Sequence, residues 1–391
     1  MNSRLEHLLR LLENSFPEIP NFHQKLSAKF EKLDNAKSFW SDIYVAHLQK
    51  LNGIALDAPD TVFIKVPIIS ENVLKRVDKD RQHELQEKLV YFSMKENLFY
   101  KHFPHNTIPN FPFPKVYYTE DVLPGEGTGG IVAENLSDQI YEVEHVPGLN
   151  HDQVLRLMEA FAGFHSHLMQ REDKSYVKDF EEGANGKEQW GVEMQKRMFD
   201  EIHNFEPLDP EFFGTDRISN IEWSFDYNNK NRAQQKAITA FPGIICHGDM
   251  NVTNMLWKKD SLNNELAAII DFQMVFIGSI AFDIVRVLTL GLSREDRRSK
   301  TKEYLEHYYK TFCGFFENGK VPMTFEQLFK QYKLIFPFAT NFSLFGISIY
   351  IRMYKEGLIG GSGNATANCE QLLDRARGIV EDIEALENTS V

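Results

Sequence analysis

The chain has 391 residues, too many for one ordinary hydrophobic core, so its length favours two lobes or domains. Hydrophobic residues make up 42% of the sequence and charged residues 25%, which is typical of a soluble globular protein. The formal charge of −13 argues against nucleic acid as the main partner, because a phosphate backbone is bound by a basic surface. These features favour an acidic, soluble, cytoplasmic protein.

The sequence carries no strong signal for disulfides, secretion or membrane insertion. Its three cysteines (Cys246, Cys313 and Cys369) show neither a disulfide framework nor zinc-ligand spacing. The N-terminal residues lack an apolar signal core and indicate an amphipathic helix. Residues 334–351 are uncharged and nearly long enough to cross a bilayer, but they include a proline and several polar side chains. We therefore predict a buried helix there and no membrane span.

The first third of the chain mixes helical and strand patterns. Apolar residues recur at helical spacing over residues 5–33, which predicts helix. Residues 41–49 alternate in part, and residues 61–66 are rich in β-branched side chains, which predicts a strand. The charged stretch 71–103 is predicted to be helical.

A proline-rich loop follows at residues 104–114. Residues 115–119 and 131–134 then predict two strands joined by a glycine-rich turn, which makes a hairpin. The region up to residue 137 is therefore predicted to form an N-terminal, nucleotide-binding lobe with an antiparallel sheet.

Beyond residue 137 the character of the sequence changes. Residues 151–170, 186–205 and 299–317 are predicted to be helical, and only two short runs, at 243–246 and 266–270, predict strands. Residues 138–391 are accordingly predicted to form a larger, mostly helical C-terminal lobe. The fold class is α+β with two lobes.

The strongest chemical signal is a set of polar residues after the two short strands. His247-Gly248-Asp249 follows the first, Asn254 lies five positions after Asp249, and Asp271 follows the second. Phosphoryl transfer requires such groups, because an amide oxygen and a carboxylate can hold a divalent metal while a second carboxylate orients the substrate hydroxyl. Each motif alone is weak. The joint pattern is strong, because the two apolar strands are predicted to form a hairpin that brings these groups to one end.

Protein kinases have the same types of residue in the same order: His-Arg-Asp with Asn five positions later, then Asp-Phe-Gly. Here Gly248 stands in place of the arginine and Gln273 in place of the last glycine. A protein kinase is nevertheless disfavoured, because no Ala-Pro-Glu segment appears and no long activation loop separates Asp271 from Asp283.

At these residues the sequence resembles the choline kinase and aminoglycoside phosphotransferase superfamily, and within it the ecdysteroid-kinase-like, or CHK-kinase-like, proteins. Residues 247–257 match the pattern HGDxxxxNxLW and residues 270–273 match IDFQ. The resemblance implies a protein-kinase-like fold and an ATP- and Mg²⁺-dependent phosphotransferase. It also implies that Asp249 is the catalytic base, that Asn254 and Asp271 bind magnesium, and that His247 orients the catalytic loop.

The resemblance assigns further residues a supporting part. Asp283 either braces the catalytic loop or caps a helix. In the first lobe it implies a lysine on a strand, Lys65, paired with a helical glutamate. Glu96 is the best candidate for that partner, and Glu87 is the competitor.

Nucleotide contacts are also implied. Glu134 and Leu136 lie in the expected linker between lobes and are predicted to neighbour the adenine. The segment expected to cover the phosphates, residues 36–44, has no glycine, so Ser38 and Ser41 are the candidates to contact phosphate.

The acceptor is predicted to be a hydroxyl of a small molecule, with a hydrophobic, steroid-like or xenobiotic alcohol favoured by the resemblance. The acidic composition leaves a cationic acceptor such as choline or an aminoglycoside open. A catalytically inactive nucleotide-binding relative that acts as a regulatory module is the other alternative, since the glycine-free segment weakens the case for turnover. The oligomeric state stays open.

Overall fold

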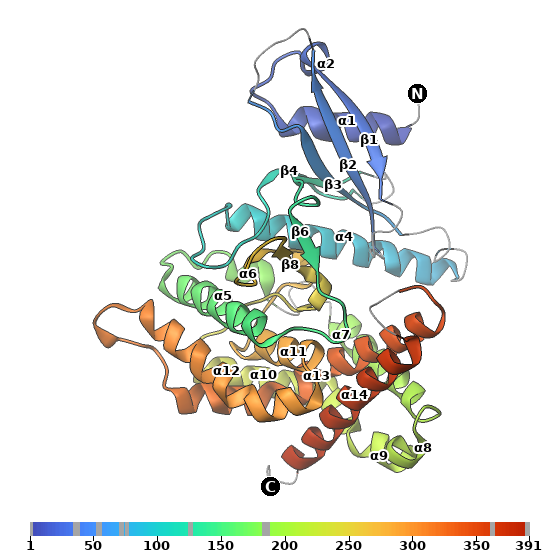
Figure 1. Cartoon of the computed structure of the whole chain (residues 1–391), viewed down its shortest axis with the longest axis vertical. Helices are drawn as coiled ribbons and strands as arrows, with labels where there is room; N and C mark the ends of the chain where they lie inside the picture. The colour runs from blue at the N-terminus through green and yellow to red at the C-terminus, as the bar shows by residue number, and fades with distance from the viewer. Residues whose placement is uncertain are drawn as a thin grey trace. The chain divides into compact units, whose positions relative to one another are not determined.

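The computed structural model describes residues 3–33, 40–51, 57–69, 74, 78–123, 128–181, 188–359 and 364–387. The chain separates into two compact units (Figure 1). Unit 1 comprises Met1–Thr107, Phe113–Ile140 and Asp271–Met274, and unit 2 comprises Ile108–Pro112, Tyr141–Ile270 and Val275–Val391. The short segment with Asp271 therefore belongs to unit 1, although it lies far along the chain.

Unit 1 contains a five-stranded sheet in the order β1-β2-β3-β5-β4, with neighbours antiparallel. Its strands are β1 (Leu26–Lys32), β2 (Ser41–Lys50), β3 (Thr61–Pro67), β4 (Val116–Glu120) and β5 (Gly130–Glu134). The central position of β3 places Lys65 opposite Ile43 on one side and Ile131 on the other. The predicted strands and the β4–β5 hairpin are confirmed.

Buried and less buried side chains alternate along β3, so the two faces of the sheet have different contacts. Val62, Ile64 and Val66 are fully buried and join a core with the apolar side of helix α1 (Ser3–Ser15). Successive strand side chains point to opposite faces, so Lys65 points away from that core. The N-terminal helix is amphipathic, as predicted.

The prediction of helix throughout residues 5–33 is wrong in its second half. Helix α1 ends at Ser15, a four-residue helix α2 (Phe22–Lys25) follows, and β1 begins at Leu26. Pro17 and Pro20 stop the first helix, because proline lacks the amide hydrogen that a helix interior needs. Pairing with β2 then overrides the helical spacing of the remaining residues.

Helix α4 (Lys79–His102) is the long helix of unit 1 and covers much of the helix predicted for residues 71–103. The side chain of Asp78 caps it by accepting a hydrogen bond from the Arg81 amide. Of residues 70–77, only Leu74 lies within the described part of the chain. The predicted loop at 104–114 contains neither helix nor strand.

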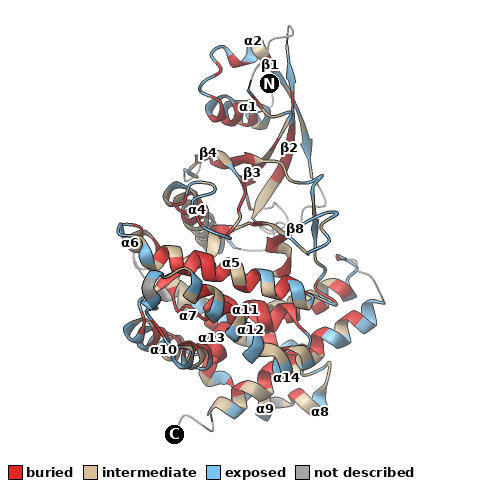
Figure 2. Ribbon diagram, turned by 60° about the vertical axis from the view of Figure 1, so that its left-hand side comes forward, coloured by how far each residue is buried: buried red, intermediate tan, exposed pale blue. Residues whose placement is uncertain are grey.

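Unit 2 is mostly helical, and the α+β prediction is confirmed. Its longer helices are α5 (His151–Gln170), α7 (Glu188–Ile202), α10 (Tyr227–Ala240), α11 (Phe282–Gly291), α12 (Arg294–Gly314), α13 (Phe325–Lys355) and α14 (Ala365–Glu387). All ten residues of α11 are buried, and Figure 2 shows this helix in the interior beside α13.

Helix α13 includes the uncharged stretch at residues 334–351. Among the described residues it is the one helix long and apolar enough to cross a membrane, and 67% of its most apolar window is buried inside the protein. The predicted buried helix is confirmed, because core packing accounts for its hydropathy.

The short strands of unit 2 pair differently from the prediction. Strand β7 (Ile244–Cys246) pairs with β10 (Phe276–Gly278), whereas β9 (Leu266–Ile269) pairs with β8 (Met255–Lys258). A third strand, β6 (Ile140–Glu142), completes the β8–β9 sheet. The prediction that the strands before Asp249 and Asp271 form one hairpin is therefore wrong. Strand β9 pairs with β8, the strand before it along the chain, and β7 pairs with β10. Sequence periodicity does not indicate these partners.

Candidate active site

The loop His247-Gly248-Asp249 begins where β7 ends, with Cys246 buried as its last strand residue. Gly248 has φ +82°, a left-handed conformation that glycine adopts without strain. The buried carboxylate of Asp283 accepts hydrogen bonds from the amides of His247 at 2.6 Å and Gly248 at 3.0 Å. Asp283 therefore braces the loop. The alternative is wrong, because Ala281 holds the N-cap position of α11.

His247 is buried and uses both ring nitrogens on backbone groups. Its Nε2 lies 2.9 Å from the carbonyl oxygen of Ile270, and its Nδ1 lies 3.3 Å from the amide nitrogen of Asp249. A carbonyl only accepts and an amide only donates, so Nε2 carries the hydrogen and Nδ1 accepts. This pattern fits a residue that orients the loop.

Asp249 is the accessible group of the loop, with a third of its side chain exposed. Its Oδ1 accepts a hydrogen bond from Nη2 of Arg286 at 3.0 Å. Arg286 lies one turn after Asp283 on α11 and is almost fully buried. Burial lowers the pKa of the Arg286 guanidinium, and the Asp249 charge opposes that effect.

Arg286 was not predicted from the sequence. The signal that could have found it is a single arginine within the apolar run from Phe282 to Leu290, because a charge on a buried helix face requires a partner.

Asn254 ends the short 3₁₀ helix η3 (Val252–Asn254) and is tied to the same loop. Its side-chain nitrogen donates to the backbone oxygen of Asp249 at 2.9 Å, and its own backbone oxygen accepts from the Ile270 amide at 3.0 Å. Within the described residues the side-chain oxygen of Asn254 has no hydrogen-bond partner. An oxygen donor therefore remains on a well-fixed amide.

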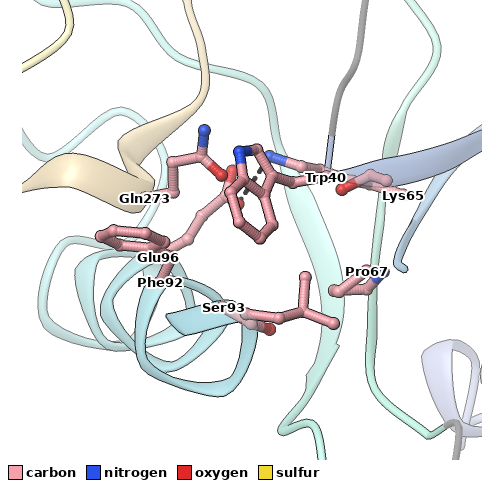
Figure 3. Close-up of a pocket in the computed structure, with 9 residues that line it drawn as sticks. Trp40, Lys65, Pro67, Phe92, Ser93, Glu96 and Gln273 are labelled. Atoms are coloured by element: carbon pink, nitrogen blue, oxygen red, sulfur yellow. Dashed lines mark hydrogen bonds and ion pairs between the residues drawn. The ribbon is translucent and has the colours of Figure 1, made fainter. Parts of the chain in front are cut away.

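In unit 1, Lys65 lies between two carboxylates. Its Nζ is 2.7 Å from Oε2 of Glu96 on α4 (Figure 3). The same Nζ is 2.5 Å from Oδ1 of Asp271. Glu87, the competing partner, is half exposed and faces His83 instead. The predicted pair of Lys65 with Glu96 is confirmed, and Asp271 joins it.

Burial opposes the charge of Lys65, but the carboxylates of Asp271 and Glu96 outweigh burial and raise its pKa. For Glu96, burial raises the pKa and the Lys65 ammonium only partly offsets that effect. Two carboxylates share one cation, so the cluster carries a net negative charge of one when both are ionised.

Asp271 follows β9 and adopts φ +70°, a left-handed conformation that is uncommon outside glycine. Its Oδ2 accepts a hydrogen bond from Nε2 of Gln273 at 3.2 Å. The next residue, Phe272, is buried and stacks on Phe99 of α4 with ring centroids 3.7 Å apart. Helix α4 thus supplies both Glu96 and the aromatic anchor of the Asp271 segment.

A small pocket lies beside this cluster (Figure 3). Ser41, at the start of β2, lines it together with Lys65, Glu96 and Gln273, and Trp40 contacts Phe92 across it with ring centroids 6.2 Å apart. Ser38, the other candidate for phosphate contact, lies outside the described residues.

The two predicted adenine neighbours lie at the end of β5. The carboxylate of the half-buried Glu134 accepts a hydrogen bond from the Lys115 amide at 2.7 Å. This bond links the end of β5 to the residue before β4. Leu136 is half-buried, and its carbonyl accepts a hydrogen bond from the Gln139 amide. Both residues belong to unit 1 with Lys65, and neither forms a hydrogen bond to the Lys65 cluster within the described residues.

Comparison with known proteins decides the family. A family model, DUF1679, described as "Uncharacterized oxidoreductase dhs-27", matches residues 63–391. The "Uncharacterized kinase-like protein D1044.1" of Caenorhabditis elegans is 32% identical over 389 residues, which are 98% of this chain and 100% of that protein. The chain belongs to this ecdysteroid-kinase-like family. Membership was predicted from the HGDxxxxNxLW and IDFQ motifs and is confirmed.

Comparison with a solved structure shows that the chain has a kinase-like fold. The GDP complex of a mutant aminoglycoside 2'-phosphotransferase-IIIa matches with a TM-score of 0.50 and 14% identity over 98% of both chains. A likeness this remote shows the fold alone. The predicted fold of the choline kinase and aminoglycoside phosphotransferase superfamily is confirmed.

The word oxidoreductase comes from a second relative. The "Uncharacterized oxidoreductase dhs-27" of C. elegans is 22% identical over 284 residues, which are 70% of this chain but only 33% of that protein. A G-x-G-x-x-G pattern at Gly125, Gly127 and Gly130 follows β4 in the sequence and ends in β5, and Gly125 and Gly127 lie outside the described residues. Because those strands pair antiparallel, the pattern does not have the strand-then-helix setting that dinucleotide binding requires.

Proposed function

We propose that this member of the ecdysteroid-kinase-like family is an ATP-dependent kinase that phosphorylates a hydroxyl of a small molecule. One observation carries the proposal: Lys65 lies in ion-pair contact with both Glu96 and Asp271. A lysine on a central strand, held by a helical glutamate and beside the aspartate of an Asp-Phe segment, is the arrangement by which kinases orient nucleotide phosphates.

The nucleotide contacts follow from this cluster. Lys65 would donate to phosphate oxygens, and Glu96 would hold its side chain in place. Ser41 lines the pocket beside Lys65 and would add a hydroxyl, with Ser38 in the preceding segment. Glu134 and Leu136 would neighbour the adenine. Bound nucleotide in the phosphotransferase of the same fold supports this assignment.

The donor set suits Mg²⁺. Asp271 offers a carboxylate and Asn254 an amide oxygen without a partner among the described residues, and Mg²⁺ prefers such hard oxygen ligands. Mg²⁺ in phosphotransferase sites is commonly held by one or two protein ligands and by substrate phosphates. Bound Mg²⁺ would neutralise charge that develops on the phosphates.

Asp249 would receive the proton of the acceptor. The acceptor hydroxyl oxygen forms a bond to the γ-phosphorus, the bond from that phosphorus to the ADP oxygen breaks, and the hydroxyl proton passes to Oδ2 of Asp249. This oxygen is the candidate because Oδ1 already accepts from Arg286. His247 takes no proton, since both ring nitrogens are hydrogen-bonded to the backbone.

A hydrophobic alcohol is the favoured acceptor. The aromatic residues of α13 divide into two groups by exposure: Phe336, Phe338 and Tyr354 are buried core, whereas Phe342, Phe345 and Tyr350 are half-buried. Two of the second group lie close to the catalytic loop. Phe342 has its ring 5.4 Å from the Arg286 guanidinium, and the Tyr350 hydroxyl is hydrogen-bonded to Asn251. These half-buried aromatic side chains would suit a steroid-like or xenobiotic acceptor, although aromatic faces can also bind a cation.

A screen for acceptors tests the proposal. ATP consumption would be measured with Mg²⁺ and a polyhydroxylated sterol, choline or kanamycin, and without acceptor. We expect the sterol-type alcohol to stimulate turnover most, and Asp249→Asn to lower the stimulated rate by about 10³-fold. Asparagine keeps an oxygen for Arg286, which limits damage to the fold. ATP binding without turnover on any acceptor would favour a regulatory binding module and contradict the proposal.

A further inference from the structure

We infer that Arg286 is a positioning residue that fixes the catalytic carboxylate of Asp249. The inference rests on the proposed kinase function and adds a residue to it. The geometry that carries it lies entirely in unit 2, where α11 holds the loop at two points.

The first point of attachment is the loop backbone. Asp283 accepts hydrogen bonds from two successive loop amides, and Gly248 takes a left-handed conformation between them. These bonds fix the path of the chain up to Asp249. They leave the rotation of the Asp249 side chain unrestrained.

The second point is the side chain itself. Arg286 lies three residues after Asp283, so both point from the same side of α11. Its Nη2 donates to Oδ1 of Asp249 at 3.0 Å. With Oδ1 engaged, the Asp249 carboxylate presents Oδ2 in one orientation. Misplacing a catalytic group by about 1 Å costs on the order of 10²-fold in rate, so this restraint matters for turnover.

Arg286 is itself held on several sides. Its guanidinium packs over the ring of Phe342 at 5.4 Å, and Nη1 lies 3.4 Å from the hydroxyl of Ser343. Its Nε is buried without a hydrogen-bond partner among the described residues. Asp249 is the carboxylate in direct contact with this buried cation, and Asp283 adds a weaker attraction. A buried arginine with one unsatisfied donor is costly in stability.

The chain provides a matched control in Arg297 of α12. Arg297 is also nearly fully buried, packs over Phe336 of α13 at 5.6 Å and is ion-paired with Asp382 of α14. It too has a buried nitrogen without a partner, Nη2. Arg297 therefore shares with Arg286 its burial, a ring contact, a carboxylate partner and a nitrogen without a partner among the described residues.

The test is a double-mutant cycle in the full chain, measured as Mg·ATP consumption with the acceptor panel described above. We expect Arg286→Met to lower kcat by about 10²-fold while KM for ATP stays within about twofold. In the Asp249→Asn background the same change should lower the residual rate by less than about twofold, because Arg286 acts through Asp249. Arg297→Met should lower thermal stability but leave kcat unchanged. Arg286→Lys, which keeps the charge, should recover part of the rate and serves if Arg286→Met does not fold.

Three results would overturn the inference and leave the proposed function intact: unchanged kcat in the Arg286 variants, multiplicative effects of Arg286→Met and Asp249→Asn, or an equal loss of kcat in Arg297→Met. Absence of turnover in the unmodified protein would instead overturn the proposed function, and the inference with it.

Discussion

The Lys65 cluster of unit 1 and the Asp249 loop of unit 2 are built on opposite principles. In unit 1 a cation lies between two carboxylates, Glu96 and Asp271, and the cluster keeps a net negative charge. In unit 2 a carboxylate is the accessible group, and a buried cation and hydrogen bonds to the loop backbone fix it. The first arrangement is governed mainly by charge and the second mainly by geometry.

This difference has consequences for function. A cluster that carries excess negative charge responds to added cations, which suits a place where Mg²⁺ and phosphates arrive and leave. A carboxylate held by a rigid buried helix has its orientation set before any substrate binds, which suits a proton acceptor. Variants of the two sites should therefore differ: those of the Lys65 cluster should change nucleotide and Mg²⁺ binding, and those of the Asp249 loop should change mainly kcat.

The largest effect is expected from Asp249→Asn. Loss of the proton acceptor should reduce kcat by about 10³-fold, within the 10²–10⁴-fold range typical of general-base catalysis. ATP affinity should change little, because Asp249 belongs to the loop and not to the Lys65 cluster. Isothermal titration calorimetry with ATP and steady-state kinetics would measure the two quantities. Weakened ATP binding with retained kcat would contradict the division of roles.

Lys65→Met should act on both binding and turnover. Removing the cation leaves Glu96 and Asp271 facing each other, and we expect KM for ATP to rise about 10-fold and kcat to fall about 10²-fold.

The same variant should bind Mg²⁺ more tightly in the absence of nucleotide. In the unmodified protein Lys65 occupies Oδ1 of Asp271, so a metal ion must compete with it. Calorimetric titration with MgCl₂ would measure this affinity. Lys88→Met, which removes an ion pair with Glu84 on the surface of α4, is the control and should leave it unchanged. Equal Mg²⁺ affinities for all three proteins would show that charge does not govern the cluster.

Asp283→Asn should have a smaller effect. The amide keeps one acceptor oxygen and loses the other, so one of the two loop amides, that of His247 or Gly248, is left without its partner. A buried donor without a partner costs about 1–3 kcal/mol in the free energy of unfolding, and we expect kcat to fall about 10-fold as the loop loosens. Urea unfolding and steady-state kinetics would check both. Full activity at reduced stability would mean that the loop does not depend on this brace.

The smallest effect on turnover, and a clear one on stability, is expected from His165 of α5. This histidine is buried against the Tyr308 hydroxyl, and burial lowers its pKa to about 3. The unfolded chain takes up a proton below its ordinary pKa of 6.5 while the folded state does not, so stability is present above pH 6.5 and is lost as the pH falls toward 3. Between pH 7 and pH 5 this group alone should cost about 2 kcal/mol.

Replacing His165 with glutamine should remove that part of the pH dependence and leave kcat at pH 7 unchanged. Urea unfolding at several pH values would measure it. Glu96 should respond in the opposite direction, because its raised pKa stabilises the protein at low pH and that contribution is lost as the pH rises. An unchanged pH slope in His165→Gln would mean that this side chain is protonated in the folded state.

Much of the site was predictable from the sequence because its residues have strong local signals. A lysine within the β-branched run of β3 and the Asp249, Asn254 and Asp271 spacing identified their positions, and the structure pairs Lys65 with Glu96 as predicted. Helix α13 was predicted as buried because polar side chains interrupt its apolar stretch. These inferences depend only on neighbouring residues.

The missing parts depend on contacts between distant segments. The pairing of β7 with β10 joins residues about 30 positions apart, and nothing in the apolar pattern of Ile244–Cys246 specifies that partner. The contact of Lys65 with Asp271 spans more than 200 residues. Arg286 could be recognised as anomalous in an apolar helix, but its carboxylate partner could not be chosen from the sequence. Strand β1 was mistaken for helix because only its pairing with β2 distinguishes the two.

The most direct test follows the transferred phosphate itself. The protein would be incubated with Mg²⁺, ATP labelled in the γ-phosphate and the acceptor that stimulates turnover most, and the label would be located by chromatography and mass spectrometry. We predict label on the acceptor hydroxyl with the unmodified protein and about 10³-fold slower labelling with Asp249→Asn. Label found only in inorganic phosphate, or equal transfer by both proteins, would contradict the account.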